Sequence, residues 1–394
     1  MRSKVSSLPG NIATAAPLSA RTCSHPCSSV IARPDGSLIR GRVTFTDRIT
    51  AVEPASNGGN DYILPGFVDL QVNGSHGIDV MNASPDEIAT LSRHLAREGA
   101  TAWMPTAVTA PIEKIAQVHE SIAGAIENSR RDDSADAAAI LGMHLEGPFI
   151  SPLRLGAHPA LNLEPRAEAL ERVLAMNSLR LITLAPELPG GIDAIRRLAA
   201  RAVVVSIGHT NATLEEANAA ITAGARMFTH LFNAMRPLNH RDPGVIAAAL
   251  APSPALAAII PDGVHVHPAM LRLACRARGI DGIILVTDKV ALAKTSASEK
   301  NVGRARAMIR DGAARLDDGT LAGSIISMLD GVRVMVEKAG VSIGDAAVMA
   351  ATNPANLVGA DDRGRIQAGA RADLIVLSRA LELKSVFIAG RELT

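Results

Sequence analysis

Cysteine and aromatic residues are scarce in this chain of 394 residues, which holds three cysteines and 2% aromatic residues. An odd number of cysteines in a long chain indicates no disulfide framework, so a reducing compartment is favoured and we expect a cytoplasmic protein. Cys23 and Cys27 flank His25 like half of a metal knuckle, but no second ligand pair follows nearby. With few rings for stacking, polar and charged contacts must carry more of any ligand binding.

The chain also lacks an excess of charge of either sign. Its 40 basic and 39 acidic residues leave a formal net charge of +1, without a basic cluster, so we expect no nucleic-acid or anionic-membrane partner. No apolar run is long enough to predict a transmembrane helix. Residues 1–34 contain no acidic residue and no apolar segment after Arg2 and Lys4. This composition favours a flexible extension over a secretory signal, and it also permits a transit peptide.

What the chain does contain, over most of its length, is an alternation of short apolar runs with helical segments. Ser84 and Thr213 each begin a capping box, and Gly99 and Gly224 close the two helices that follow. The apolar runs that read as strands are 62–72, 100–106, 137–145, 179–185, 202–207, 225–229, 256–260 and 282–287. This pattern predicts an α/β fold, a (β/α)8 TIM-like barrel.

Both ends of the chain show a different pattern, in which short β-rich runs are separated by turn residues. Such runs lie between Val30 and Val52 and again between Ala372 and Ile388. Two ends that each supply a few strands can form one small β-sandwich beside the barrel. We therefore expect residues 1–61 to form an extension and the first part of the sandwich, 62–361 the barrel, and 362–394 the rest of the sandwich.

Four of the strand-like runs end in a residue that can bind a metal or move a proton. These residues are Glu146, His209, His230 and Asp288. Glu146 is followed by Gly-Pro, which cannot continue a strand. Because the carboxyl ends of barrel strands meet at one mouth, we expect the four side chains to lie together, with Gln71 and His265 nearby. An isolated Glu or His is more often structural, so the inference depends on all four together.

The chemistry of this set points to a catalytic metal. One carboxylate and two imidazoles, from Glu146, His209 and His230, suit Zn²⁺ or Fe²⁺ and leave coordination open for water. Such a metal lowers the pKa of bound water toward roughly 7. Asp288 is placed to take the proton of that water and to pass it to a leaving group.

Several motifs are recognisable at this point. The segment 64–69 (LPGFVD) resembles the opening barrel strand of the amidohydrolase superfamily. Others resemble its N-acetylglucosamine-6-phosphate deacetylase branch: 144–149 (HLEGPF), 208–210 (GHT), 229–235 (THLFNAM), 261–265 (PDGVH) and 286–288 (VTD). The match covers roughly residue 62 to the C-terminus in the expected order, and its motifs are specific only in combination.

The resemblance implies hydrolysis of N-acetylglucosamine 6-phosphate to glucosamine 6-phosphate and acetate. It implies a metal at the Glu/His/His set and Asp288 as general base and then general acid. Many amidohydrolases carry His-x-His on the first strand and bind two metals, whereas this chain has Gln71 and Asn73 at the matching positions. We therefore expect one divalent metal per chain, Zn²⁺ before Fe²⁺ or Co²⁺.

Substrate contacts are also implied by position. His158 matches a histidine that polarises the acetyl carbonyl, and His265 matches one that contacts the substrate. Asn233 and Ala234 match contacts to the phosphate. Met328 fits the family's substrate-facing loop only loosely.

The resemblance further implies a homodimer, because Arg241 matches an arginine that reaches the phosphate in the neighbouring subunit. A guanidinium suits that task, since it can donate two hydrogen bonds to a phosphate. The chain departs from the family pattern at Lys289, where a small residue is usual. It also departs over 291–311, a charged stretch that is compatible with a mobile lid.

Two kinds of alternative stay open. The same chemistry could act on N-acetylgalactosamine 6-phosphate or on another small amide, such as an N-acyl amino acid. A barrel relative without catalysis could instead serve as a sugar-phosphate-binding protein. The presence of Asp288 beside all three ligand positions argues against this second alternative.

Overall fold

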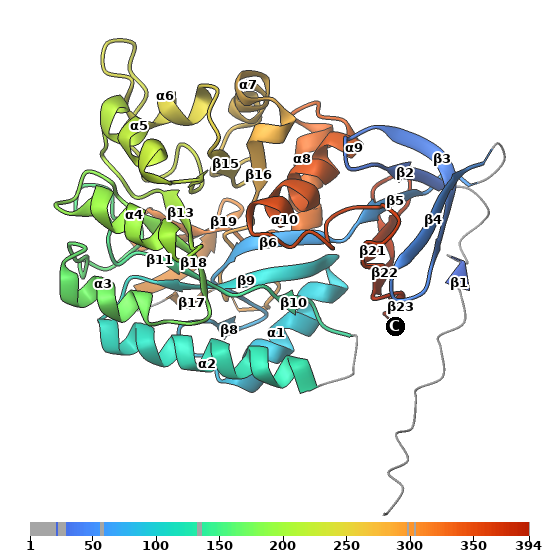
Figure 1. The fold of residues 1–394 in the computed structure, drawn as a ribbon, viewed down its shortest axis with the longest axis horizontal. Coiled ribbons are helices and arrows are strands. Elements are labelled where there is room, and N and C mark those ends of the chain that lie inside the picture. Colours follow the sequence, from blue (N-terminus) through green and yellow to red (C-terminus); the bar gives the residue numbers. More distant parts are fainter. Residues whose placement is uncertain are drawn as a thin grey trace, which may run out of the picture.

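The computed structural model describes residues 21–22, 29–55, 59–131, 136–297, 299–302 and 305–393. The Cys23, His25 and Cys27 group lies outside these residues. The predicted α/β barrel is confirmed. It occupies most of the molecule, and the sheet made by the chain ends lies at one side of it (Figure 1).

Parallel pairing runs from strand to strand around the barrel. Closure between the first and last strands comes from a parallel bridge of Val72 with Lys289 and from the Asp288 N–H, which donates to the Gln71 carbonyl over 2.9 Å. The carboxyl ends of all these strands therefore meet at one mouth. The barrel strands are β6 (Phe67–Val72), β9 (Ala100–Val108), β11 (Met143–Glu146), β12 (Leu179–Leu184), β13 (Val204–Ile207), β14 (Met227–Phe228), β15 (Leu256–Ile259) and β16 (Ile283–Leu285).

Helices α1 to α7 lie between successive barrel strands, whereas α8 to α10 follow the last one and α9 contacts β2 and β5 of the end sheet. The two predicted capping boxes are confirmed, since Ser84 and Thr213 accept from the backbone N–H of Glu87 and Glu216, whose carboxylates accept in return. The helices are α1 (Pro85–Arg97), α2 (Ile112–Arg131), α3 (Ala167–Leu174), α4 (Gly191–Ala200), α5 (Leu214–Ala223), α6 (Gly244–Leu250), α7 (Pro268–Arg278), α8 (Met328–Glu337), α9 (Ile343–Ala347) and α10 (Asn353–Leu357).

Two strands expected to be continuous are interrupted at glycines. The run 62–72 divides at Gly66, where a Cβ would lie 2.2 Å from the Thr101 hydroxyl, so that β5 (Tyr62–Pro65) joins the end sheet and only β6 belongs to the barrel. The run 137–145 divides at Gly142, whose φ of 139° ends β10 (Ala139–Ile140) before β11 begins. Both interruptions redirect the chain at a position that tolerates no side chain.

The end sheet brings together strands from the N-terminal and C-terminal parts of the chain, as predicted. In Figure 1 the blue strands β2 to β5 lie beside the red strands β21 and β22; β5 pairs parallel with β2 and antiparallel with β21. A separate apolar cluster that includes Phe45 and Phe387 fills this region. The remaining strands are β1 (Arg21–Thr22), β2 (Ser29–Ala32), β3 (Leu38–Phe45), β4 (Ile49–Pro54), β21 (Leu374–Leu377), β22 (Leu383–Ile388) and β23 (Arg391–Glu392).

Two described segments of the charged stretch after Asp288 form β-strands. A four-stranded antiparallel sheet consists of β17 (Glu299–Val302), β18 (Ala305–Arg310), β19 (Ala313–Leu316) and β20 (Leu321–Gly323). Its apolar side packs on Val290 and Leu292. A short hairpin of β7 (Gly74–Ser75) and β8 (Ile78–Asp79) follows the first barrel strand on the same side of the barrel.

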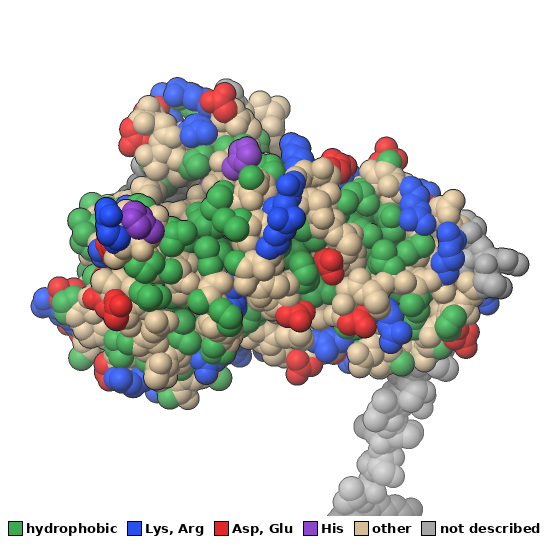
Figure 2. Space-filling view, turned by 90° about the horizontal axis from the view of Figure 1, so that it is seen from above, with side chains coloured by type: hydrophobic (Ala, Val, Ile, Leu, Met, Phe, Trp, Pro, Cys, Tyr) green, Lys and Arg blue, Asp and Glu red, His purple; other side chains and the backbone are tan. Residues whose placement is uncertain are grey.

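Charges of both signs are interspersed on the face in Figure 2, in keeping with the net charge of +1. Within the described ranges, no helix combines the length and the apolar character needed to cross a membrane.

Candidate active site

Three residues at the barrel mouth, each two or three positions past the end of its strand, have left-handed backbone conformations. The φ angles are 46° at His209, 29° at His230 and 49° at Asp288. A non-glycine residue in this region costs about 1–3 kcal/mol and persists only where its surroundings hold it. The Ser151 N–H donates to the His209 carbonyl over 2.8 Å, which is one such restraint. The backbone is thus locally strained at the positions where these three side chains point into the barrel mouth.

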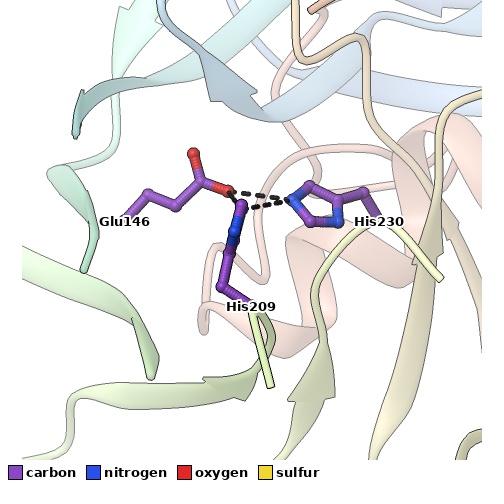
Figure 3. Close-up of side chains that lie close together, drawn as sticks. All are labelled: Glu146, His209 and His230. Atoms are coloured by element: carbon purple, nitrogen blue, oxygen red, sulfur yellow. Dashed lines mark hydrogen bonds and ion pairs between the residues drawn. The ribbon is translucent and has the colours of Figure 1, made fainter. Parts of the chain in front are cut away.

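Glu146, His209 and His230 converge on one point from three strand ends (Figure 3). His230 Nε2 lies 3.0 Å from Glu146 Oε1 and 3.1 Å from His209 Nε2, and His209 Nε2 lies 3.3 Å from the same carboxylate oxygen. All three side chains are buried.

The protonation of these side chains follows from their neighbours. His209 Nδ1 lies 2.9 Å from the Arg154 carbonyl, which can only accept, so Nδ1 carries the proton and Nε2 offers its lone pair. Burial and the neighbouring His158 lower the pKa of His209 to about 4, which keeps the ring neutral. Burial alone would raise the pKa of Glu146, but hydrogen bonds from His158, His209 and His230 outweigh it and hold the pKa well below its usual value. Glu146 is therefore ionised.

These three side chains fit a divalent metal. Two imidazole nitrogens and one carboxylate oxygen face one another in three close contacts. A proton on one of these atoms can form a hydrogen bond in only some of the contacts, whereas a cation between the atoms interacts with all three. Donor atoms around a tetrahedral Zn²⁺ lie about 3.4 Å apart, close to the separations found here. The chain therefore has a site for a divalent metal at Glu146, His209 and His230, with a neutral His209 as one ligand.

Asp288 lies beside this site and is held by amides. Gln71 Nε2 donates to Asp288 Oδ1 over 3.1 Å and to Glu146 Oε1 over 2.9 Å, and Asn73 Nδ2 donates to Asp288 Oδ1 over 2.7 Å. Burial, together with the negative charge of Glu146, raises the pKa of Asp288 to about 6. A carboxyl group with such a pKa can both accept and release a proton near neutral pH.

Two further histidines reach the same space, each oriented by a partner. The Thr109 N–H points at His158 Nδ1 over 3.4 Å and the Thr109 hydroxyl lies 2.8 Å from it, so Nδ1 accepts and Nε2 carries the proton. That Nε2 lies 3.5 Å from Glu146 Oε2. His265 Nδ1 pairs with Asp262 Oδ2 over 2.6 Å, which leaves Nε2 available to a ligand.

A cavity of about 870 Å³ opens over these groups. Glu146, His209, His230 and Asp288 line it, as do four of the predicted substrate contacts, namely His158, Asn233, Ala234 and His265. Met328 does not line it; it begins α8 and is buried in the main apolar core. Arg241 is exposed and lines a second, smaller pocket of about 480 Å³ with Arg154 and Arg236.

Sequence reasoning missed the residues that orient the histidines. Asp262 stands three residues before His265, a spacing that suggests a local hydrogen bond, so it could have been found. Thr109 lies 49 residues from His158, and Arg154 lies 55 residues from His209, so no local sequence pattern indicates these contacts. His144, two residues before Glu146, binds Leu70 O and Thr183 Oγ1 in the barrel interior and is no part of the site.

Comparison with known proteins places the chain in a family. The amidohydrolase family matches residues 62–393. An N-acetylglucosamine-6-phosphate deacetylase from Bos taurus is 37% identical, over 89% of this chain and 87% of that protein. An N-acetylgalactosamine-6-phosphate deacetylase from Escherichia coli O157:H7 is 36% identical, over 87% of this chain and 92% of that protein.

Solved structures agree with the sequence relatives. N-acetylglucosamine-6-phosphate deacetylase from Thermotoga maritima superposes with a TM-score of 0.87 at 30% identity, covering 93% of this chain and 99% of that one. A mutant of the Mycobacterium smegmatis enzyme, in complex with N-acetyl-D-glucosamine-6-phosphate, gives 0.86 at 32% identity, covering 94% and 99%. The chain therefore belongs to the amidohydrolase family, in the branch of the N-acetylglucosamine-6-phosphate deacetylases.

Proposed function

We propose that this protein hydrolyses N-acetylglucosamine 6-phosphate to glucosamine 6-phosphate and acetate. The observation that carries the proposal is the convergence of the Glu146, His209 and His230 donor atoms beside Asp288, in one cavity. A binding protein without catalysis would need neither the buried carboxyl group with its raised pKa nor the oriented His158.

In this reaction each side chain has one role, and its hydrogen-bond partners orient it for that role. When bound, a divalent metal at Glu146, His209 and His230 supplies Lewis acidity, which eases loss of a proton from water and polarises a carbonyl. Asp288 accepts the proton of the attacking water and then delivers it to the departing amine nitrogen. His158 donates from Nε2 to the carbonyl oxygen as negative charge develops there. Gln71 and Asn73 keep the Asp288 carboxylate aimed at the reacting atoms.

The proposed metal is Zn²⁺, at one ion per chain. A carboxylate and two imidazoles also suit Fe²⁺ or Co²⁺. The amides of Gln71 and Asn73 are poor ligands for a second ion, and they already donate to Asp288. Elemental analysis of purified protein tests the count: about one metal per chain, lost on Glu146→Ala or His209→Ala, is expected, and about two with full activity would contradict it.

We also propose a homodimer in which Arg241 reaches the phosphate bound to the neighbouring subunit, while Asn233 and Ala234 bind the same phosphate from within. The pocket around Arg241 is flanked by apolar surface, since Leu153 is 71% exposed and Leu238 is 49% exposed. Apolar side chains beside a guanidinium are typical of a protein–protein contact. A cytoplasmic location is proposed from the cysteine usage.

A second candidate substrate is N-acetylgalactosamine 6-phosphate, favoured by the 36% identity to the Escherichia coli O157:H7 deacetylase of that sugar phosphate. Acetate release should be measured with the metal-loaded protein on both sugar phosphates and on unphosphorylated N-acetylglucosamine. We expect N-acetylglucosamine 6-phosphate to have the highest kcat/KM and the unphosphorylated sugar the lowest. A preference for the galactose epimer would select the second candidate, and no acetate release from any of them would refute the function.

A further inference from the structure

The cavity extends beyond the groups that the proposed reaction uses. One wall comes from the loops after the first two barrel strands, opposite the side of the mouth where Asn233 and Ala234 lie. The lining residues of this wall are Asp79, Met81, Asn82, Val108, Ala110 and Lys114. None of them has a task in acetate release as proposed above.

The geometry of an amide directs its acyl group toward this wall. The sugar is attached to the amide nitrogen, and the acyl chain leaves the carbonyl carbon on the opposite side. In the proposed function the phosphate lies at Asn233 and Ala234, and the carbonyl lies beside His158. The acyl chain then points away from Asn233 and Ala234. Thr109, the partner of His158, lies on the same wall and is flanked there by Val108 and Ala110.

This wall has both apolar and polar lining residues, and the polar ones are Asp79, Asn82 and Lys114. Val108, Ala110 and Met81 form the apolar part, and the Val108 N–H approaches the Met81 sulfur at 3.2 Å, which links the two loops. Asn82 follows Met81 in the loop after β8, and Lys114 lies at the start of α2, four residues after Ala110. An acyl chain of a few carbons with a polar end would match this combination of apolar and polar side chains.

Lys114 is the one lysine or arginine among the described residues that line the cavity. It is half-buried, and its ammonium has no hydrogen-bond or ion-pair partner in the part of the chain that the structure describes. It also lies in the first turn of α2 (Ile112–Arg131), where the positive end of the helix dipole disfavours a cation. An anion bound there would be attracted by both the ammonium and the helix terminus.

We propose that this wall is a subsite for N-acyl groups longer than acetyl that end in a carboxylate, with Lys114 as the residue that selects them. The inference rests on the proposed function. In the reaction, water adds its oxygen to the acyl carbon, the carbon–nitrogen bond breaks, and Asp288 passes the water's proton to the nitrogen. The products are the amino-sugar phosphate and a dicarboxylate, and no further reactant is needed.

The test compares three synthetic substrates on the metal-loaded protein: N-acetyl-, N-succinyl- and the neutral N-succinamoyl-glucosamine 6-phosphate. We expect the succinyl compound to be hydrolysed with a kcat/KM at least tenfold above that of the succinamoyl compound. Lys114→Gln should lower the succinyl value ten- to a hundredfold, as expected for loss of a charge-assisted hydrogen bond. The acetyl value should fall less than threefold. Lys114→Arg should retain most of the preference, and Lys338→Gln, an exposed lysine at the end of α8, is the matched control.

The outcomes separate this inference from the function on which it rests. Turnover of the acetyl compound without turnover of the succinyl compound would overturn the subsite alone. An equal loss for the acetyl and succinyl compounds in Lys114→Gln would show that Lys114 binds the 6-phosphate or supports the fold, and would also overturn it. If no acyl compound were hydrolysed, the proposed function itself would fail, and the subsite with it.

Discussion

Asp288 has the surroundings of a proton carrier rather than those of a structural ion pair. The hydrogen bonds to its carboxylate come from the Gln71 and Asn73 amides, which orient it without neutralising it. Burial then raises its pKa toward neutrality. At the scale of single residues, the Asp288 carboxylate is therefore fixed in orientation but can change its protonation state.

Replacing Asp288 by Asn should leave the fold and the metal in place, because the shape and the neighbouring amides are nearly preserved. The variant should lose on the order of 10²–10⁴ in kcat, the usual contribution of general acid–base catalysis. Steady-state acetate release and metal analysis of the same preparation measure the two effects. Near wild-type turnover would move the proton transfer to another group, with His158 or His265 next in line.

The pKa of Asp288 also predicts how activity depends on pH. The base form exists above the pKa, so kcat/KM should fall about tenfold per pH unit once the pH drops below it. The pKa of about 6 sets an upper limit for this acid limb, since the charge of a bound cation lowers it further. A pH profile of the wild type shows the limb, and the residual rate of Asp288→Asn should lack it. An acid limb centred above pH 7 would contradict the assignment.

At the scale of elements, a buried ion pair joins the segment that follows the last barrel strand to the C-terminal cap of the first helix. The Lys289 side chain is almost fully buried, and its Nζ lies 2.6 Å from Glu98 Oε2 at the C-terminal end of α1. The other Glu98 oxygen lies 3.5 Å from His76 in the β7–β8 hairpin. One carboxylate thus links three elements around the backbone that carries Asp288.

Removing one partner of this pair should be costly. Glu98→Ala leaves a buried ammonium unpaired, and we expect the free energy of unfolding to fall by about 3–5 kcal/mol. The double variant Glu98→Gln/Lys289→Met removes both charges and should lie much closer to the wild type. Urea denaturation followed by circular dichroism measures both. A loss below about 1 kcal/mol in Glu98→Ala would show that water already solvates Lys289.

At the scale of the whole molecule, the proposed dimer completes each site with a residue from the partner. Arg241→Ala should raise KM for the sugar phosphate roughly ten- to a hundredfold, as expected for a charge-assisted hydrogen bond. Unphosphorylated N-acetylglucosamine, a poor substrate, should be hardly affected. Steady-state assays on both compounds provide this comparison.

Mixing Arg241→Ala chains with Asp288→Asn chains tests from which subunit the arginine comes. In a heterodimer, the Asp288→Asn chain supplies Arg241 to the site whose aspartate is intact, so activity at low substrate should recover. Each homodimer by itself is the control. Verified heterodimers without recovered activity would mean that Arg241 acts within its own chain or does not touch the phosphate.

Much of the architecture could be predicted from the sequence because the patterns that indicate it are local. The capping boxes at Ser84 and Thr213 and the strand–helix alternation each depend on residues within a few positions of one another. The positions of Glu146, His209, His230 and Asp288 after strand-like runs, together with barrel topology, sufficed to predict that they would meet.

Only the tertiary structure decided the features that join distant segments. Glu98 lies 191 residues from Lys289, and Arg154 lies 55 residues from the imidazole that its carbonyl orients. The division at Gly66, the four-stranded sheet after Asp288 and the cavity wall that includes Lys114 likewise depend on which segments pack together. Burial, tautomers and cavity shape are properties of contacts between such segments, so no local pattern in the chain could specify them.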